Sequence, residues 1–148
     1  MNIIPSLSRY LSAVQTAIID ECTDGLRDTD LRGVQLFYLL AVCQNPGLSQ
    51  DGLAQQLGVN SSNVTRQLGE LETLGYIHRR RNHADGRQWL VDPTDRAYEM
   101  LPRLVEVLGD AQTALMREIS QEEQELFLDL SERMAKNAAR RAAKRKKI

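Results

Sequence analysis

The sequence lacks any long apolar stretch. Its longest uninterrupted apolar run extends from Leu36 to Cys43, far short of the ~20 residues that a membrane-spanning helix requires. The first residues also lack a basic segment followed by an apolar one, which is the pattern of a secretory signal. We therefore expect a cytoplasmic protein that has no membrane partner.

Cysteine and histidine are scarce. The chain has two cysteines, Cys22 and Cys43, and two histidines, His78 and His83. Neither pair has the spacing or the neighbours of a metal site, and structural disulfides are rare in the cytosol. We interpret the cysteines as small apolar core residues, and we predict neither a metal nor a cofactor.

Enzyme signatures are also missing. The sequence contains no Gly-rich phosphate loop, no nucleophile elbow and no metalloprotease helix. We therefore predict that the protein is not an enzyme and that it has no catalytic residues.

The chain has no excess of positive charge, because its formal net charge is −1. Taken alone, this value argues against a nucleic-acid-binding protein, but the distribution of the charges reverses that conclusion. Seven of the 19 basic residues lie at the end of the chain, namely Lys136, Arg140, Arg141, Lys144, Arg145, Lys146 and Lys147. The other 12 Lys and Arg lie in residues 1–135 together with all 20 acids, so this part of the chain has a net charge of −8. Within the acidic body a second basic group stands close together, and a local basic face is what phosphate binding needs. This group consists of Arg66, Arg79, Arg80, Arg81 and Arg87.

Two short helices are predicted in the middle of the chain. Ser49 can cap the first helix, which Gly58 ends. Asn60 can cap a second helix over residues 61–74, which Gly75 ends in the left-handed conformation. The second helix has one apolar stripe at helical spacing, formed by Val64, Leu68, Leu71 and Leu74.

A basic hairpin is predicted directly after these helices. Residues 76–81 and 87–91 resemble strands, and Asp85-Gly86 lies in the connection between them, which is a strong hairpin signal. We expect Trp89 to pack between the hairpin and a helix rather than to serve as a stacking platform. A helix pair followed by such a hairpin predicts a winged helix-turn-helix, in which one helix enters the major groove of double-stranded DNA.

The order of these motifs resembles the MarR family of bacterial transcriptional regulators, and the resemblance covers nearly the whole chain. It rests on Leu53-Ala54, Leu57-Gly58-Val59, Val64-Thr65-Arg66, Leu71-Glu72, Gly75-Tyr76-Ile77, Arg80, Asp85-Gly86-Arg87, Val91 and Thr94. One departure is Pro93-Thr94-Asp95-Arg96-Ala97, where the family often has Leu-Thr-x-x-Gly. The resemblance implies a wing whose Asp-x-Arg inserts into DNA, and an effector that is an aromatic carboxylate or a phenol. In some members one cysteine near the first helix senses oxidants.

Four longer helices are predicted around this region. One covers residues 3–22 with Ile4, Leu7, Leu11, Val14 and Ile18 at helical spacing, and a buried one covers residues 31–44. After Asp92-Pro93 breaks the strand, Thr94 is the expected cap of a helix to residue 119 that carries Leu101, Leu104, Val105, Leu108, Ala111 and Leu115. A capping box, Ser120 to Glu123, begins a last helix with Leu126, Phe127, Leu130 and Met134. The apolar surface of these helices is larger than so small a domain can bury by itself, so we expect a homodimer.

The predicted fold is mainly α with a small β-hairpin wing, in a single domain over residues 1–148. A winged helix-turn-helix DNA-binding lobe covers 31–93, dimerisation helices cover 1–24 and 94–135, and a basic C-terminal tail covers 136–148. The tail is either a solvated helix end or an electrostatic arm that adds DNA affinity.

The candidate DNA-binding residues are Ser61, Ser62, Asn63, Thr65, Arg66, Gln67, Arg80, Asp85 and Arg87. Arg66 is suited to guanine, Asn63 or Gln67 to adenine, and Ser61 or Ser62 to phosphate at the helix N-terminus. Asp85 lies two residues from Arg87, and we expect its carboxylate to hold the guanidinium in one orientation.

Three functional hypotheses follow. The first is a regulator, acting as a repressor, that binds a pseudo-palindromic operator as a homodimer and is released by a small aromatic effector in a pocket lined by Tyr10, Leu36 and Tyr38. The second is a winged-helix module that binds another protein. The third is a redox-sensing regulator that acts through Cys22.

Overall fold

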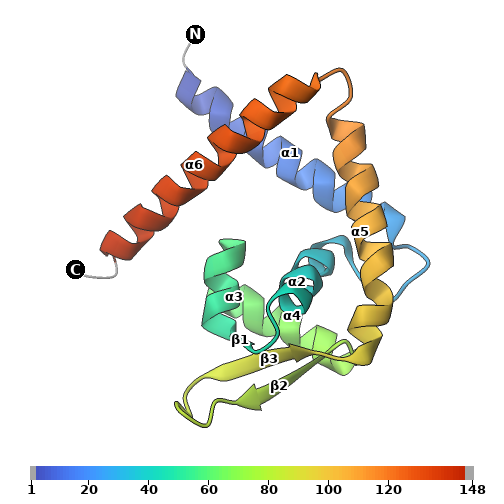
Figure 1. The fold of residues 1–148 in the computed structure, drawn as a ribbon, viewed down its shortest axis with the longest axis vertical. Helices are drawn as coiled ribbons and strands as arrows, with labels where there is room; N and C mark the ends of the chain where they lie inside the picture. Colours follow the sequence, from blue (N-terminus) through green and yellow to red (C-terminus); the bar gives the residue numbers. More distant parts are fainter. Residues whose placement is uncertain (1–2, 146–148) are drawn as a thin grey trace. The chain divides into compact units, whose positions relative to one another are not determined.

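The computed structural model describes residues 3–145, and this part of the chain contains six helices and three short strands (Figure 1). The predicted fold class, mainly α with a hairpin wing and further helices before and after it, is confirmed. The chain divides into two compact units between Gln112 and Thr113. The helices α1 to α6 span Ile3–Gly25, Gly33–Gln44, Gln50–Leu57, Ser61–Thr73, Asp95–Leu115 and Gln121–Arg145, and the strands β1 to β3 span Leu48–Ser49, Ile77–Arg81 and Trp89–Pro93.

Local capping chemistry sets the ends of α3 and α4 as predicted. The hydroxyl of Ser49 accepts the Gly52 N–H at 3.0 Å, and the side chain of Asn60 accepts the Asn63 N–H at 2.9 Å. At the other ends, Gly58 and Gly75 adopt φ values of 66° and 81°, a region that costs other residues energy. The helix-turn-helix therefore begins and ends where short-range chemistry dictates.

Helix α2 lies at the centre of the core and packs against α1, α3, α4 and β3. As its apolar composition predicted, most of it is buried. Burying each large side chain contributes about 1.5–3 kcal/mol relative to leaving it exposed. The fully buried apolar residues of these elements include Leu36, Leu39, Val42, Leu53, Leu68, Leu71 and Val91.

Helix α2 begins at Gly33, two residues later than predicted. Gly33 is required because a Cβ atom there would lie 2.4 Å from the carbonyl oxygen of Ile19 in α1. Helices α1 and α2 therefore approach too closely for a larger residue. In the first turn of α2, the side chain of Gln35 accepts the N–H of Arg32, the residue before the helix, at 2.9 Å.

The sheet contains a strand that the sequence did not predict. The strand order is β1-β3-β2, with β1 paired to β3 through Leu48 and Val91. The hairpin of β2 and β3 lies where expected, but β3 runs through Asp92 to Pro93, which pairs with Ile77. The prediction that Asp92-Pro93 ends the strand was therefore wrong by two residues. Strand β1 pairs only with Leu90 and Val91, so at Pro93 β3 has a partner on one side alone, and proline is tolerated at such an edge.

A polar cluster connects α5 with the loop before α2 and with the residue that precedes β2. The hydroxyl of Tyr76 donates to Asp30 at 2.6 Å, and Arg96 of α5 donates to the same carboxylate at 2.8 Å. The guanidinium of Arg96 also lies over the Tyr76 ring, 4.4 Å from its centroid. Burial and the hydrogen bond to Asp30 raise the pKa of Tyr76 to about 12. The hydrogen bond from Tyr76, together with Arg96, lowers the pKa of Asp30 below its usual value.

Three details of α5 differ from the prediction. Thr94 does not cap this helix through its hydroxyl, which instead donates to the carbonyls of Gly75 and Tyr76 at 2.7 and 3.0 Å. The buried face includes Val107, whereas Val105 is 58% exposed. The helix ends at Leu115 rather than residue 119.

The second unit contains α6, which begins with the predicted capping box. The Glu123 carboxylate accepts the Ser120 N–H at 2.8 Å, and the Ser120 hydroxyl accepts the Glu123 N–H at 3.3 Å. The helix continues through the basic tail as far as Arg145. Lys146, Lys147 and the side chain of Ile4 lie outside the described residues. Over residues 3–145, no helix has the length and apolar character needed to cross a membrane.

Candidate nucleic-acid interface

The exposed face of α4 carries most of the predicted DNA-binding residues. Ser61, Ser62, Thr65 and Arg66 are exposed, and Asn63 is half-buried. Asn60 organises the first turn, since its side-chain oxygen accepts both the Ser62 hydroxyl at 2.8 Å and the Asn63 N–H at 2.9 Å. A polar helix N-terminus of this kind favours phosphate.

Arg66 is held loosely on this face. Its guanidinium donates to the Asn63 side-chain oxygen at 3.4 Å and lies 3.9 Å from the Glu70 carboxylate. Its side chain remains 57% exposed. Long contacts and high exposure leave the guanidinium available to a base edge or a phosphate.

Gln67 departs from the prediction. It is only 4% exposed, and its side-chain oxygen accepts a hydrogen bond from Arg32 at 3.3 Å. It lies on the core side because it stands three residues after Val64 and four before Leu71, which places all three on one face of the helix. The proposed contact from Gln67 to adenine is therefore corrected, and Asn63 remains the candidate.

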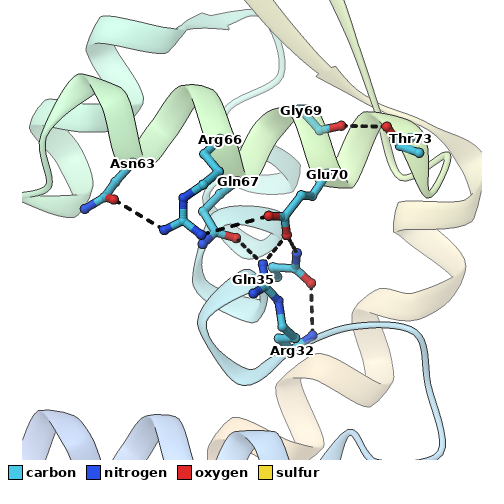
Figure 2. Close-up of polar contacts among 8 residues, drawn as sticks. All are labelled: Arg32, Gln35, Asn63, Arg66, Gln67, Gly69, Glu70 and Thr73. Carbon is cyan, nitrogen blue, oxygen red and sulfur yellow. Dashed lines mark hydrogen bonds and ion pairs between the residues drawn. The ribbon is translucent and has the colours of Figure 1, made fainter.

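Glu70 occupies the centre of a polar network between α4 and the start of α2 (Figure 2). Its carboxylate pairs with Arg32 and accepts from the Gln35 side chain at 2.9 Å. A hollow of about 490 Å³ opens beside this network, and Arg32, Arg66 and Glu70 are among its lining residues. This network could not be predicted from the sequence, because its contacts between the start of α2 and α4 join residues that are 35 or more positions apart.

Two arginines of the wing are engaged within the protein. Arg79 donates to the Glu72 carboxylate at 2.8 and 2.9 Å and to Gln50 at 3.3 Å, and Arg80 donates to Asp92 at 2.6 Å. Although partial burial opposes the shift, the bonds from Arg79 lower the pKa of Glu72 below its usual value. Arg79 is therefore a structural residue, and Arg80 is partly neutralised.

Arg81 and Trp89 form a stacked pair on β2 and β3. The guanidinium of Arg81 lies 4.2 Å from the centroid of the Trp89 ring and donates to the Gly86 carbonyl at 2.7 Å. Trp89 is 38% exposed. The pair stabilises the base of the wing loop, and the expectation that Trp89 packs between the hairpin and a helix stays a prediction.

Asp85 shapes the wing tip through the backbone. Its carboxylate accepts the Arg87 N–H at 3.1 Å, and its carbonyl accepts the Gln88 N–H at 3.0 Å. Among residues 3–145 no ion pair of the Arg87 guanidinium is found, so the predicted contact from Asp85 to that group is absent from this structure. A side chain two residues before an amide is well placed for a local turn, and Arg87 is left exposed.

The residues proposed for an effector pocket differ in burial. Leu36 and Tyr38 are 0% and 3% exposed in the core, whereas Tyr10 of α1 is 59% exposed. Burial raises the pKa of Tyr38, although Arg66 opposes the shift. The hydroxyl of Tyr10 accepts from Arg9 at 3.2 Å.

Neither cysteine has the surroundings of a reactive thiolate. Cys22 is fully buried, and burial together with the neighbouring Glu21 raises its pKa. Burial also raises the pKa of Cys43. In the described part of the chain, no group of His, Cys, Asp and Glu is arranged to hold a metal ion.

Comparisons with known proteins agree with this geometry. Residues 29–88 match the model of the MarR family. The HTH-type transcriptional regulator YybA of Bacillus subtilis is 26% identical over 114 residues, which cover 77% of this chain and 76% of that protein. The crystal structure of MarR is 27% identical, with a TM-score of 0.83 over 93% of this chain and 94% of that one. A putative MarR family regulator from Listeria monocytogenes, solved with a 26mer DNA, has the same fold at 20% identity, with a TM-score of 0.84 over 94% of this chain and 93% of that one.

Proposed function

We propose that this chain is a member of the MarR family of transcriptional regulators and that it is a repressor, which binds a pseudo-palindromic operator as a homodimer and leaves it when a small molecule binds. The match of residues 29–88 to the family model and the shared fold support this proposal. It would act on double-stranded DNA in the cytoplasm and would not be an enzyme. The homodimer, the repression of transcription and the release by a small molecule go beyond the similarity to known regulators.

One observation carries the DNA-binding part of the proposal. The exposed N-terminal half of α4 and the exposed wing tip belong to the same compact unit. A helix of about 10–12 Å diameter fits the major groove, while an exposed arginine on a hairpin can reach the neighbouring minor groove. We assign base contacts to Arg66 and Asn63, phosphate contacts to Ser61, Ser62 and Thr65, and a groove contact to Arg87.

The remaining candidate residues have supporting roles in this proposal. Asp85 fixes the turn that presents Arg87. Arg80 is 45% exposed in its side chain while paired with Asp92, so it can add a screened contact to phosphate.

The effector is proposed to be a small aromatic carboxylate or phenol. Tyr10, Leu36 and Tyr38 supply aromatic and apolar surface for such a ring. Because Leu36 and Tyr38 are buried, the ligand must open part of the core, which would couple its binding to the arrangement of the DNA-binding elements.

Selection of binding sites from random double-stranded DNA by the full-length protein tests the function. We expect enrichment of an inverted repeat, and we expect benzoates or phenols to release the selected DNA. Failure to enrich any sequence would overturn the DNA-binding proposal and favour a protein-interaction module. Enrichment without release by any aromatic compound would overturn only the effector class.

A further inference from the structure

Glu70 poses a problem for a DNA-binding helix. It lies four residues after Arg66 on α4, a spacing at which Arg and Glu side chains pair on a helix surface. A free carboxylate there would repel phosphate and would draw the Arg66 guanidinium away from a base. An acid at this position would therefore oppose DNA binding unless another group occupied it.

The structure shows that Glu70 is already occupied. One carboxylate oxygen, Oε2, accepts from Gln35 at 2.9 Å and pairs with the Arg32 guanidinium. The other oxygen, Oε1, lies 3.9 Å from Arg66, which is longer than a hydrogen bond. The carboxylate is thus held toward α2, and its contact with Arg66 is weak (Figure 2).

The groups that hold Glu70 are themselves fixed. Gln35 is only 2% exposed, and its side-chain oxygen accepts the Arg32 N–H at 2.9 Å. The Arg32 guanidinium also donates to Gln67 at 3.3 Å. Arg32 therefore has acceptors on two successive turns of α4, a geometry that suits the planar guanidinium group better than an ammonium group.

From these contacts we propose that Arg32 is a positioning residue for DNA recognition, which neutralises Glu70 and so keeps the Arg66 guanidinium free for a base. The inference rests on the proposed function. Arg32 acts through Glu70 rather than through a contact of its own with DNA. Without Arg32, the Glu70 carboxylate turns to Arg66 and competes with the operator.

Removing the charges of both Arg32 and Glu70 separates this positioning role from a direct contact with DNA and from a purely structural role. We expect Arg32→Ala to weaken operator binding by about tenfold, within the range of one lost bidentate base contact, and to relax the preference at the base pair that Arg66 contacts. The double variant Arg32→Ala/Glu70→Gln should recover both affinity and preference, because no carboxylate then competes for Arg66. Glu70→Gln alone should bind at least as tightly as the parent.

Two further variants serve as controls. Arg27→Ala removes a guanidinium from another surface ion pair, with Asp24 at 2.7 Å, so it measures the effect of lost charge alone. Arg32→Lys keeps a cation beside Glu70 but loses the planar group, so it should bind between Arg32→Ala and the parent. It also keeps the test open if Arg32→Ala folds poorly. Thermal melting of every variant reports the stability of the α2–α4 contact separately from affinity.

The outcomes are distinct. Parental affinity and base preference in Arg32→Ala would overturn the inference. An equal loss in Arg32→Ala and in the double variant would also overturn it, since Arg32 would then contact DNA itself or act only as a structural link. If the parent protein selects no DNA at all, the proposed function fails before this comparison begins.

Discussion

At the scale of single residues, the wing tip depends on Asp85 and Arg87, which have different tasks. Asp85 accepts the Arg87 N–H at 3.1 Å and so fixes the turn. Arg87 has its side chain in solvent, where it contributes little to folding. An exposed arginine on a fixed turn is preorganised for a narrow groove of negative potential.

We predict that Arg87→Ala costs about 1–3 kcal/mol of operator binding. Asp85→Ala should cost less in the same direction, because the turn loosens while the guanidinium remains. The pair should be non-additive, since the turn matters only when the arginine is present. Titration of operator DNA with both single variants and the double variant measures each loss of binding free energy and shows whether the losses add.

Melting temperatures provide the control for this experiment. Both side chains are exposed, so the variants should unfold close to the parent. Parental affinity in Arg87→Ala would mean that the wing is only a turn, and DNA recognition would then rest on α4 around Arg66.

Residue types alone did not reveal which polar side chains are engaged inside the protein. Gln67 and Arg79 looked like exposed helix and wing residues, yet Arg32 and Glu72 hold them in the structure. Burial of a polar group requires a partner, and these partners come from other elements. The exposed residues Ser62 and Arg66 were predictable because the apolar stripe of α4 defines the opposite face.

At the scale of whole elements, features set by neighbouring residues were predictable. Ser49, Asn60 and Ser120 cap their helices as expected, since each cap acts within three residues of the chain. Strand β1 was not predictable, because two residues carry no periodicity and are ordered only by pairing with β3. The choice of Val107 over Val105 likewise depends on the core that α5 meets, where Val107 lies against Gly25.

The C-terminal part of α6 has two different faces. Lys136, Arg140 and Lys144 recur every four residues, and Arg141 and Arg145 lie on the adjoining row, while the alanines occupy the other side. Lys136 pairs with Glu132 at 2.5 Å, and no ion pair is found for the four later cations of the described helix. The sequence beyond Glu132 contains no acid, so this face is suited to a polyanion.

We predict that deletion of residues 136–148 weakens specific and non-specific DNA binding alike. The salt slope of log affinity should fall by about 0.9 for each lost phosphate contact, while the footprint stays the same. A variant with Arg140, Arg141, Lys144 and Arg145 changed to Gln serves as the matched control, since it keeps the helix length. Affinity measured against salt concentration decides between the alternatives, because an unchanged slope in both variants would make the tail a solvated helix end.

At the scale of the whole molecule, apolar side chains remain uncovered on both terminal helices. On α1, Leu7, Leu11 and Val14 are 42–43% exposed. On one face of α6, Leu126, Phe127, Leu130 and Met134 are 43–58% exposed. Monomeric proteins rarely leave several large apolar residues together on one helix face, and a second copy of the chain offers the same surfaces in return.

We predict a stable homodimer whose two copies of α4 bind half-sites about 10 base pairs apart, or a multiple of that, on one face of the duplex. Sedimentation of the full chain at micromolar concentration should show no substantial monomer. Leu130→Glu should produce monomer and weaken operator binding, because it places a charge within the apolar stripe that Leu126 and Met134 share at four-residue spacing.

Leu128→Glu is the matched control, since Leu128 is 62% exposed and lies about half a turn away from that stripe on the same helix. It should leave both the dimer and the affinity intact. Helix content measured for both variants shows whether α6 still folds. A parent protein that sediments as a monomer and still binds an inverted repeat tightly would contradict the assembly, because each recognition helix would then have to act alone on its half-site.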